Sequence, residues 1–215
     1  MIASVDLAMG RVLDALERAQ LLERTVVVFT SDNGGAVHFR ATDNAPLRKG
    51  KGFAYEGGLR VPLIVRPPGS RGDGAARGRV VDAPVSGIDL FPTLAALAGV
   101  AAPHDLTLDG ADLGPLLRGD GELGRAALTW HFPHYWWGTN VQPYSAIRRG
   151  DLKLIYRYES GTCELYDLAN DVGEANDLVD ERPELVREVR DELFRTLAAQ
   201  GARMPEPNPE FGEGR

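Results

Sequence analysis

The sequence predicts an α/β fold: a partial parallel or mixed sheet flanked by helices, followed by a small antiparallel sheet with a carboxyl-terminal helix. Helical and strand patterns alternate in the first part of the chain, short strands then follow one another directly, and a long amphipathic run comes near the end. We therefore expect an α/β part at residues 1–120, a small β-plus-helix part at residues 121–203 and an extended proline-rich tail at residues 204–215.

In the first part, apolar residues recur at helical spacing from Val5, and a continuous β-branched run follows them. Such a run is typical of a parallel strand that is covered on both faces. A polar, glycine-rich loop is expected at Ser70–Arg79, and Asp89 is the candidate N-cap of the next helix. The predicted elements are a helix over Val5–Ala19, strands at Val26–Phe29, Leu59–Val65 and Val80–Val85, and a helix over Leu90–Val100.

In the second part, tight turns such as Arg149–Asp151 separate short strands, which favours antiparallel pairing. Leu185, Val189, Leu193 and Leu197 recur every four residues and predict the closing helix. The predicted elements are strands at Ala127–His131, Ser145–Arg148, Leu152–Tyr158 and Glu164–Leu168, and a helix over Pro183–Gln200.

Composition excludes several classes of protein. With 24 basic and 31 acidic residues, the net charge of 24 − 31 = −7 argues against nucleic-acid binding, which needs a basic face. Cys163 is the only cysteine and forms no internal disulfide. No apolar run approaches the ~20 residues of a membrane span. Residues 1–6 do not resemble a secretory leader and run straight into the first helix, so we expect a chain cut from something longer; the compartment stays open.

Polar residues follow the first predicted strand in the run Thr30–Gly35. In open α/β sheets, ligands bind beyond the carboxyl ends of the strands. Asp32 and Asn33 offer a carboxylate and an amide oxygen there, which suit Ca²⁺ or Mg²⁺. The alternative is an ordinary turn, because all these residue types favour turns.

A glycine-rich loop, Asn44–Gly58, carries Lys51 between two glycines. Glycines let the backbone approach a ligand, and a lysine presents a point charge to a tetrahedral anion. The spacing is not that of a Walker A loop, since no Ser or Thr follows the lysine. A solvated lysine on a surface loop is the alternative.

Taken together, these segments resemble the sulfatase family of the alkaline-phosphatase superfamily. The resemblance runs from residue 1 to about residue 209 and covers only the carboxyl-terminal half of a sulfatase, with residues 1–120 as the end of its catalytic domain. The segments that carry it are Val26–Gly35, Pro46–Gly52, Tyr55–Pro62, Val85–Leu94, Leu108–Gly110, Leu116–Gly119 and Glu164–Leu168.

The resemblance implies a sulfuric ester hydrolase that acts on a small-molecule or glycan sulfate ester. It implies that Asp32 and Asn33 ligate a divalent cation, usually Ca²⁺ with Mg²⁺ as the alternative, and that Lys51 contacts the sulfate group. A phosphatase or phosphonate-ester hydrolase of the same superfamily remains the alternative, because both present tetrahedral anions to a metal.

The family's nucleophile, a formylglycine made within a Cys/Ser-x-Pro-x-Arg motif, has no counterpart in these residues. Cys163 lacks the proline and arginine in register, and no serine fits. We therefore expect formylglycine in a missing amino-terminal half, and an isolated chain that is incomplete and inactive. A partial sheet leaves an uncovered apolar face, so the missing half or self-association is the expected partner.

Further candidates for substrate contact are Arg48, just before Lys49 in the same loop, and His134, in the aromatic run Trp130–Trp137 that could line a rim for a sugar or aryl group. A solvated Arg48 and packing of His131 and His134 are the alternatives. His38 and His104 are expected on exposed loops.

Overall fold

In the computed structural model, the described residues are 2–39, 42–69, 78–101, 105–119 and 121–209. They form two compact units, one of residues 1–30 and 62–125 and the other of residues 31–61 and 126–215. The predicted loop at Ser70–Arg79 lies mostly outside the described residues, as do His104 and the last six residues of the tail. The described tail, Met204–Pro209, forms neither helix nor strand.

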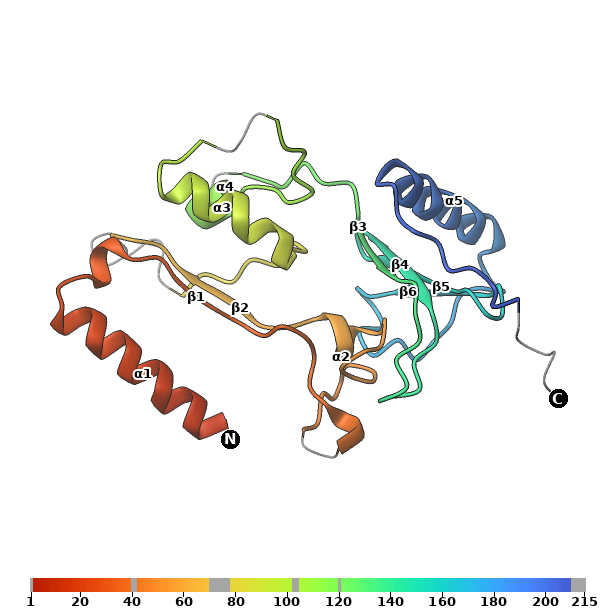
Figure 1. Cartoon of the computed structure of the whole chain (residues 1–215), viewed down its shortest axis with the longest axis horizontal. Coiled ribbons are helices and arrows are strands. Elements are labelled where there is room, and N and C mark those ends of the chain that lie inside the picture. The colour runs from red at the N-terminus through yellow and green to blue at the C-terminus, as the bar shows by residue number, and fades with distance from the viewer. Residues whose placement is uncertain (1, 40–41, 70–77, 102–104, 120, 210–215) are drawn as a thin grey trace. The chain divides into compact units, whose positions relative to one another are not determined.

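The first unit contains a two-stranded sheet and helices (Figure 1). The strands pair antiparallel with Val28 opposite Val65, which corrects the expected parallel strand. A continuous apolar run indicates that a strand is covered, not which way its neighbour runs. The elements are α1 (Ile2–Arg18), a 3₁₀ turn (Leu22–Arg24), β1 (Val27–Thr30), β2 (Leu63–Arg66), a 3₁₀ turn (Gly87–Asp89), α3 (Leu90–Leu97) and α4 (Gly114–Arg118).

Two further expectations for this unit were wrong. The strand expected at Leu59–Val65 begins only at Leu63, because a helical turn ends at Leu59 and Pro62 has no N–H for a ladder. The described segment at Val80–Val85 is not a strand. Val80 is 82% exposed, so the segment lacks the packing that would hold it in a sheet.

Asp89 is the N-cap residue of α3, as the sequence predicts, but its buried side chain makes no capping hydrogen bond to that helix. Ser86 is the N-cap of the preceding 3₁₀ turn, and its backbone N–H donates to the Asp89 carboxylate at 2.8 Å. Ala111 N–H donates to the other carboxylate oxygen at 2.8 Å, and Arg125 forms an ion pair with it. The carboxylate therefore fixes the loop before α4 and the chain after it to the start of α3.

The second unit is built on an antiparallel sheet in the order β3–β4–β5–β6, which confirms the predicted small sheet. Helix α5 covers one face of it (Figure 1). Period-2 alternation sends Leu154 toward α5 and Lys153 and Ile155 to the other face. The elements are β3 (Leu128–Phe132), β4 (Tyr144–Arg149), β5 (Leu152–Arg157), β6 (Cys163–Asp167) and α5 (Pro183–Ala199).

The other face of this sheet is covered by the segment 31–61, which includes a 3₁₀ turn (Val37–Phe39) and α2 (Glu56–Leu59). Ala54 and Tyr55 pack there in one apolar cluster with Ala146, Ile155 and Tyr166. The oxygen-donor and lysine segments therefore belong to the carboxyl-terminal unit, whereas the predicted division of the chain places them at residues 1–120. Whether that division describes the domains of a longer sulfatase stays a prediction.

The first unit carries much exposed apolar surface. Helix α1 has no buried residue, although it is amphipathic. Val5 and Val12 on this helix are about half exposed, and so are Ile64 of β2 and Phe91 of α3. Such surface favours association with a further layer of protein. Within the described ranges, no helix combines the length and the apolar character that crossing a bilayer requires.

Helix α5 gives the first test of the fold. Leu193 is fully buried against the sheet, so Leu193→Ala should lower the free energy of unfolding by about 2–5 kcal/mol, through lost burial and the cavity left behind. Urea unfolding followed by tryptophan fluorescence measures this. The control is Arg195→Ala on the exposed side of the same helix, which should change stability by less than about 0.5 kcal/mol. Equal losses in the two variants would contradict the described packing.

Candidate functional site

Residues Ser31–Gly35, here the oxygen-donor turn, follow β1 in the chain and are held by their own hydrogen bonds. The Ser31 hydroxyl donates to Asn33 O at 2.8 Å, and Asn33 N–H donates to Asp32 Oδ1 at 2.9 Å. Asn33 Nδ2 donates to Gly34 O at 3.0 Å, which leaves its side-chain oxygen on the opposite side of the amide group. Asp32 is exposed and Asn33 half-buried. The turn thus presents two hard oxygen donors on adjacent residues.

The glycine loop (Asn44–Gly58) lies directly against this turn. Lys51 N–H donates to Gly35 O at 3.1 Å, and Gly34 N–H donates to Gly58 O at 3.0 Å. Within the loop, Gly57 N–H donates to Arg48 O at 3.0 Å. The backbone that carries Lys51 is therefore hydrogen-bonded to the segment that carries Asp32 and Asn33.

The Asn44 side chain holds the same backbone from inside. Its Nδ2 lies 3.1 Å from Gly35 O, 3.0 Å from Lys49 O and 3.1 Å from Gly57 O. One amide group thus serves carbonyls of the oxygen-donor turn and of both arms of the glycine loop. The amide thus adds a side-chain link between the two segments to the bond that Gly35 O accepts from Lys51 N–H.

Gly34 allows this close approach, and Gly52 allows Trp136 to lie against the loop. A Cβ on Gly34 would lie 1.8 Å from Gly57 O, so any side chain there would force the turn and the loop apart. Gly52 has φ +91°, and a Cβ on it would lie 2.3 Å from ring atoms of Trp136. The two segments touch through backbone, which leaves little freedom for Lys51 to shift.

The Lys51 side chain is half-buried beside an aromatic ring. Its Nζ lies 5.8 Å from the centroid of the Trp136 ring, a distance at which a cation is attracted to the π face. The same ring makes an edge contact with His38, with 6.5 Å between the centroids. Trp136 therefore flanks the Lys51 ammonium, a role that the sequence did not assign to it.

Arg48 points into the protein. Its Nη1 donates to the Tyr166 hydroxyl at 2.9 Å and to Glu174 O at 2.8 Å, and its guanidinium lies 4.1 Å from the centroid of the Tyr55 ring. Burial disfavours the cation, but the phenol groups of Tyr55 and Tyr166 outweigh this effect and raise the pKa of Arg48. These partners give Arg48 a structural function; contact with substrate stays a prediction.

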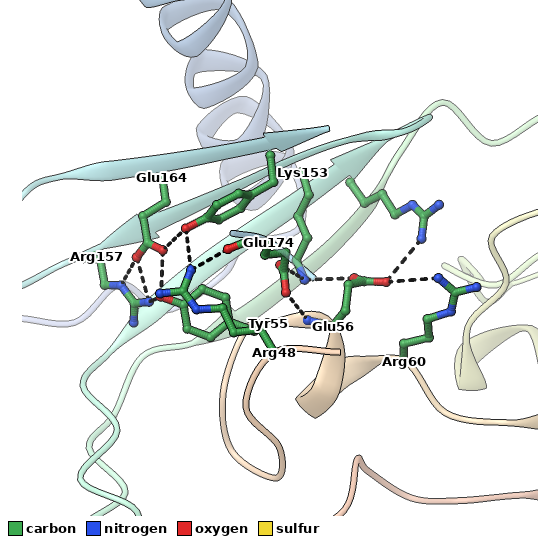
Figure 2. Close-up of polar contacts among 10 residues, drawn as sticks. Arg48, Tyr55, Glu56, Arg60, Lys153, Arg157, Glu164 and Glu174 are labelled. Atoms are coloured by element: carbon green, nitrogen blue, oxygen red, sulfur yellow. Dashed lines mark hydrogen bonds and ion pairs between the residues drawn. The ribbon is translucent and has the colours of Figure 1, made fainter. Parts of the chain in front are cut away.

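Three buried charged residues, here called the ion cluster (Glu56, Lys153 and Glu174), join the glycine loop to the sheet (Figure 2). Lys153 Nζ lies 2.9 Å from a carboxylate oxygen of Glu56 and 2.9 Å from one of Glu174. Lys153 and Glu174 are fully buried, and the Glu56 side chain is 4% exposed. Arg148 and Arg60 approach Glu56 at 3.7 and 3.9 Å and add positive charge.

A second polar group lies beside this cluster and centres on Glu164 (Figure 2). Tyr55 and Tyr166 each donate their hydroxyl to Glu164 Oε2 at 2.7 Å, and Arg157 donates to Oε1 at 2.8 Å. Burial opposes ionisation, but these bonds outweigh it and hold the pKa of the Glu164 carboxyl below its usual value. Burial and the bond to Glu164 raise the pKa of Tyr55 to about 12, so Tyr55 remains a hydrogen-bond donor at neutral pH.

The two described histidines of the aromatic run differ in their surroundings. His131 Nδ1 lies 2.7 Å from the Ser145 hydroxyl and its Nε2 lies 2.8 Å from Arg203 O, so both ring nitrogens have partners, as the packing alternative requires. His134 is exposed and its ring lies 3.9 Å from that of Phe132. Its role in substrate binding stays a prediction.

The donor set of the oxygen-donor turn fits a hard divalent cation. Among the residues that the structure describes, neither Asp32 Oδ2 nor Asn33 Oδ1 accepts a hydrogen bond, and both are oxygens of the kind Ca²⁺ prefers. The described part of the chain contains no group of three or more His, Cys, Asp or Glu side chains that could hold a metal. These two residues would thus supply part of a coordination sphere.

Comparisons with known proteins agree with this arrangement. Residues 1–100 match the family model described as Sulfatase. A sulfatase of Formosa agariphila is 40% identical over 196 residues, covering 83% of this chain and 34% of that protein. Mouse (Mus musculus) steryl-sulfatase is 34% identical over 240 residues, covering 96% of this chain and 38% of that protein.

A protein solved in complex with its substrate D-glucosamine-2-N,6-O-disulfate superposes with a TM-score of 0.69 at 28% identity, over 92% of this chain and 39% of that one. These matches define the class as hydrolases of sulfate esters. The chain belongs to the sulfatase family and corresponds to the carboxyl-terminal part of its members. It spans well under half the length of the relatives that it matches.

Sequence reasoning missed the ion cluster. Glu56 stood in the family motif without a role, Lys153 in a strand pattern, and Glu174 in no predicted element. The available signal was Lys153 itself, because a charged side chain between Leu152 and Leu154 in a central strand needs buried partners. The sequence did not indicate which partners, since they lie 97 residues upstream, at Glu56, and further along the chain, at Glu174.

The close packing at Gly34 gives a second test. Gly34→Ala should push the oxygen-donor turn from the glycine loop and lower the free energy of unfolding by about 1–3 kcal/mol or more. The control is Gly10→Ala, where nothing lies within 4 Å of the added Cβ in α1 and alanine should stabilise the helix by roughly 0.5–1 kcal/mol. Urea titrations of both variants measure the difference. A Gly34→Ala variant as stable as wild type would show that the two segments are not in backbone contact.

Glu164 gives a pH-dependent test. Because folding lowers the pKa of this carboxyl from 4.5, its ionised form stabilises the fold above pH 4.5, and that contribution is lost as the pH falls through the folded-state pKa. Glu164→Gln should therefore destabilise the chain by about 1.5–3 kcal/mol at pH 7, with the difference from wild type shrinking below pH 4.5. Chemical unfolding from pH 3 to pH 7 measures it. Exposed Glu181→Gln is the control; a Glu164→Gln deficit that is constant with pH would contradict the ionised hydrogen-bonded centre.

Proposed function

We propose that this chain supplies the sulfate-binding lysine and part of the divalent-metal site of a sulfuric ester hydrolase. The observation that carries the proposal is the bond from Lys51 N–H to Gly35 O, which joins the glycine loop to the oxygen-donor turn. Membership of the sulfatase family supports the reaction class. The chain would contribute these groups to a complete site whose nucleophile is carried outside these 215 residues.

Lys51 would hold the sulfate group through charge. Hydrolysis of a sulfate ester builds negative charge on the leaving oxygen while the sulfate oxygens need neutralising. The Lys51 backbone is held by Gly35 O and its ammonium lies beside the Trp136 ring, so the lysine is placed before substrate arrives and little rearrangement opposes binding. Half-burial of the side chain strengthens its field relative to a lysine in open water.

Asp32 and Asn33 would hold the cation, Ca²⁺ by preference and Mg²⁺ as the alternative. A bound cation of this kind would neutralise sulfate oxygens as a Lewis acid. Asn33 would bind through its side-chain oxygen, since Nδ2 is engaged by Gly34 O. Asp32 would bind through Oδ2, because Oδ1 accepts the Asn33 N–H. The remaining ligands would come from outside this pair.

The substrate would be a small-molecule or glycan sulfate ester. One structural relative was solved with a sulfated glucosamine and one sequence relative is a steryl-sulfatase. Similarity to these proteins therefore does not determine which alcohol the sulfate ester contains. The exposed ring of His134 and the neighbouring Trp137, 91% exposed, offer surfaces on which a sugar or aryl ring can stack. Arg48 would hold the loop through Tyr166 and Glu174 O, and its contact with substrate remains a prediction.

The exposed apolar residues of the first unit support association with further protein, either an amino-terminal sulfatase segment or a second copy of the chain. On this proposal, the 215 residues alone bind Ca²⁺ weakly and turn over sulfate esters negligibly, because Asp32 and Asn33 would supply only part of the coordination sphere and the sequence contains no Cys/Ser-x-Pro-x-Arg motif.

The test is an aryl sulfate assay of the chain completed by an amino-terminal sulfatase segment, fused or added separately. Lys51→Ala and Asp32→Ala should each lower kcat/KM by about 10²-fold or more, because each removes charge stabilisation of the reacting group. The matched control is Lys49→Asn, which removes an ammonium two residues away and tolerates the positive φ of that position. Unchanged turnover in the Lys51 and Asp32 variants would refute the assigned roles.

A further inference from the structure

Glu174 combines three unusual properties. It is fully buried, it is ionisable, and it has φ +53°, which is unfavourable for a residue with a Cβ. Such strain persists only where surrounding contacts enforce it, and it concentrates at functional sites. Burial also raises the pKa of its carboxyl, an effect opposed by Lys153. The residue lies in a turn after β6, in a segment to which the sequence assigned no role.

This backbone conformation lets one residue hold the glycine loop at two points (Figure 2). The Glu174 carbonyl accepts from Arg48 Nη1 at 2.8 Å, and its Oε2 accepts from Glu56 N–H at 2.7 Å. Arg48 stands three residues before Lys51, and Glu56 stands five residues after it. Glu174 is thus hydrogen-bonded to the glycine loop on both sides of Lys51.

Glu174 is itself held by an ion pair with a lysine of the sheet. Lys153, on β5, pairs with Glu174 at 2.9 Å and with Glu56 at 2.9 Å, and none of the three side chains is more than 4% exposed. Because buried charges without partners are costly, the two carboxylates hold positions around this ammonium. A shift of Glu56 would separate charges in a poorly solvated place.

Backbone hydrogen bonds connect Arg48 and Glu56, the two residues bonded to Glu174, with Lys51. Arg48 O accepts from Gly57 N–H, Gly58 O accepts from Gly34 N–H, and Gly35 O accepts from Lys51 N–H. At Gly34 the two segments meet backbone to backbone, and the Asn44 amide bonds to carbonyls of both. A displacement at Arg48 or Glu56 therefore moves Lys51 relative to Gly35 and the oxygen-donor turn.

We propose that Glu174 is a positioning residue for the Lys51 ammonium, acting through Arg48 and Glu56. The proposal rests on the proposed function of Lys51 as the sulfate contact. It assigns the turn after β6 to the alignment of the anion site, although Glu174 itself touches no substrate. The alternative is that Glu174 only contributes to the stability of the whole unit.

Glu174→Gln is the main test, because it keeps the shape and the carbonyl bond but removes the negative charge. Hydrogen exchange of the 215-residue chain, read by mass spectrometry, should show exchange in residues 50–58 faster by about tenfold or more, with β4 and β5 unchanged. The rate at which the Lys51 amine is acylated should change relative to the rate at Lys49, which serves as the internal reference. Glu188→Gln, which removes a surface carboxylate paired with Arg149, is the matched control and should change neither readout.

Glu174→Gly is the second variant, since it relieves the positive φ while removing the carboxylate, and it should loosen residues 50–58 in the same way. In the completed enzyme, both variants should raise KM for an aryl sulfate more than they lower kcat, and Glu174→Asp should recover part of the loss.

Unchanged exchange at residues 50–58, an equal increase across β4 and β5, or failure of both the Gln and Gly variants to fold would overturn the positioning role. The proposed function fails separately: Lys51→Ala would then leave activity intact whatever the exchange data show.

Discussion

The structure of the carboxyl-terminal unit depends on one buried ammonium. Lys153 lies between the carboxylates of Glu56 and Glu174, and all three are shielded from water. Replacing such a group by apolar residues is often neutral for stability, whereas removing one member leaves an uncompensated charge. The arrangement therefore matters for geometry: through Glu56 it ties α2, at the end of the glycine loop, to Lys153 of the sheet.

Backbone hydrogen bonds then connect the glycine loop to the candidate site. Lys51 and the oxygen-donor turn are joined by amide-to-carbonyl bonds, with Asn44 bridging three carbonyls and Gly34 allowing the closest approach. An anion site gains most when its charges are in place before the ligand binds, because reorganisation then costs little. Here the candidate groups lie on loops, and the buried sheet provides the rigidity that loops alone lack.

The two units differ in how completely their apolar side chains are covered. The second covers its sheet on both faces, with α5 on one and the glycine loop on the other. The first leaves apolar side chains of α1, β2 and α3 exposed, and its described sheet has only two strands. This contrast agrees with a family in which the matched relatives are more than twice as long as the matched part.

The sequence by itself determined the elements with clear periodicity, which are α1, α5 and the four antiparallel strands, and its motifs determined the family. These follow from local spacing, because burial repeats every two residues in a strand and about every 3.6 in a helix. Only the tertiary structure decided that β1 and β2 are antiparallel and that residues 31–61 pack on the β3–β6 sheet. The same holds for the inward direction of Arg48 and for the ion pairs of Lys153 with Glu56 and Glu174. Partners about a hundred residues apart leave no trace in local spacing, since what unites them is the need of a buried charge for an opposite one.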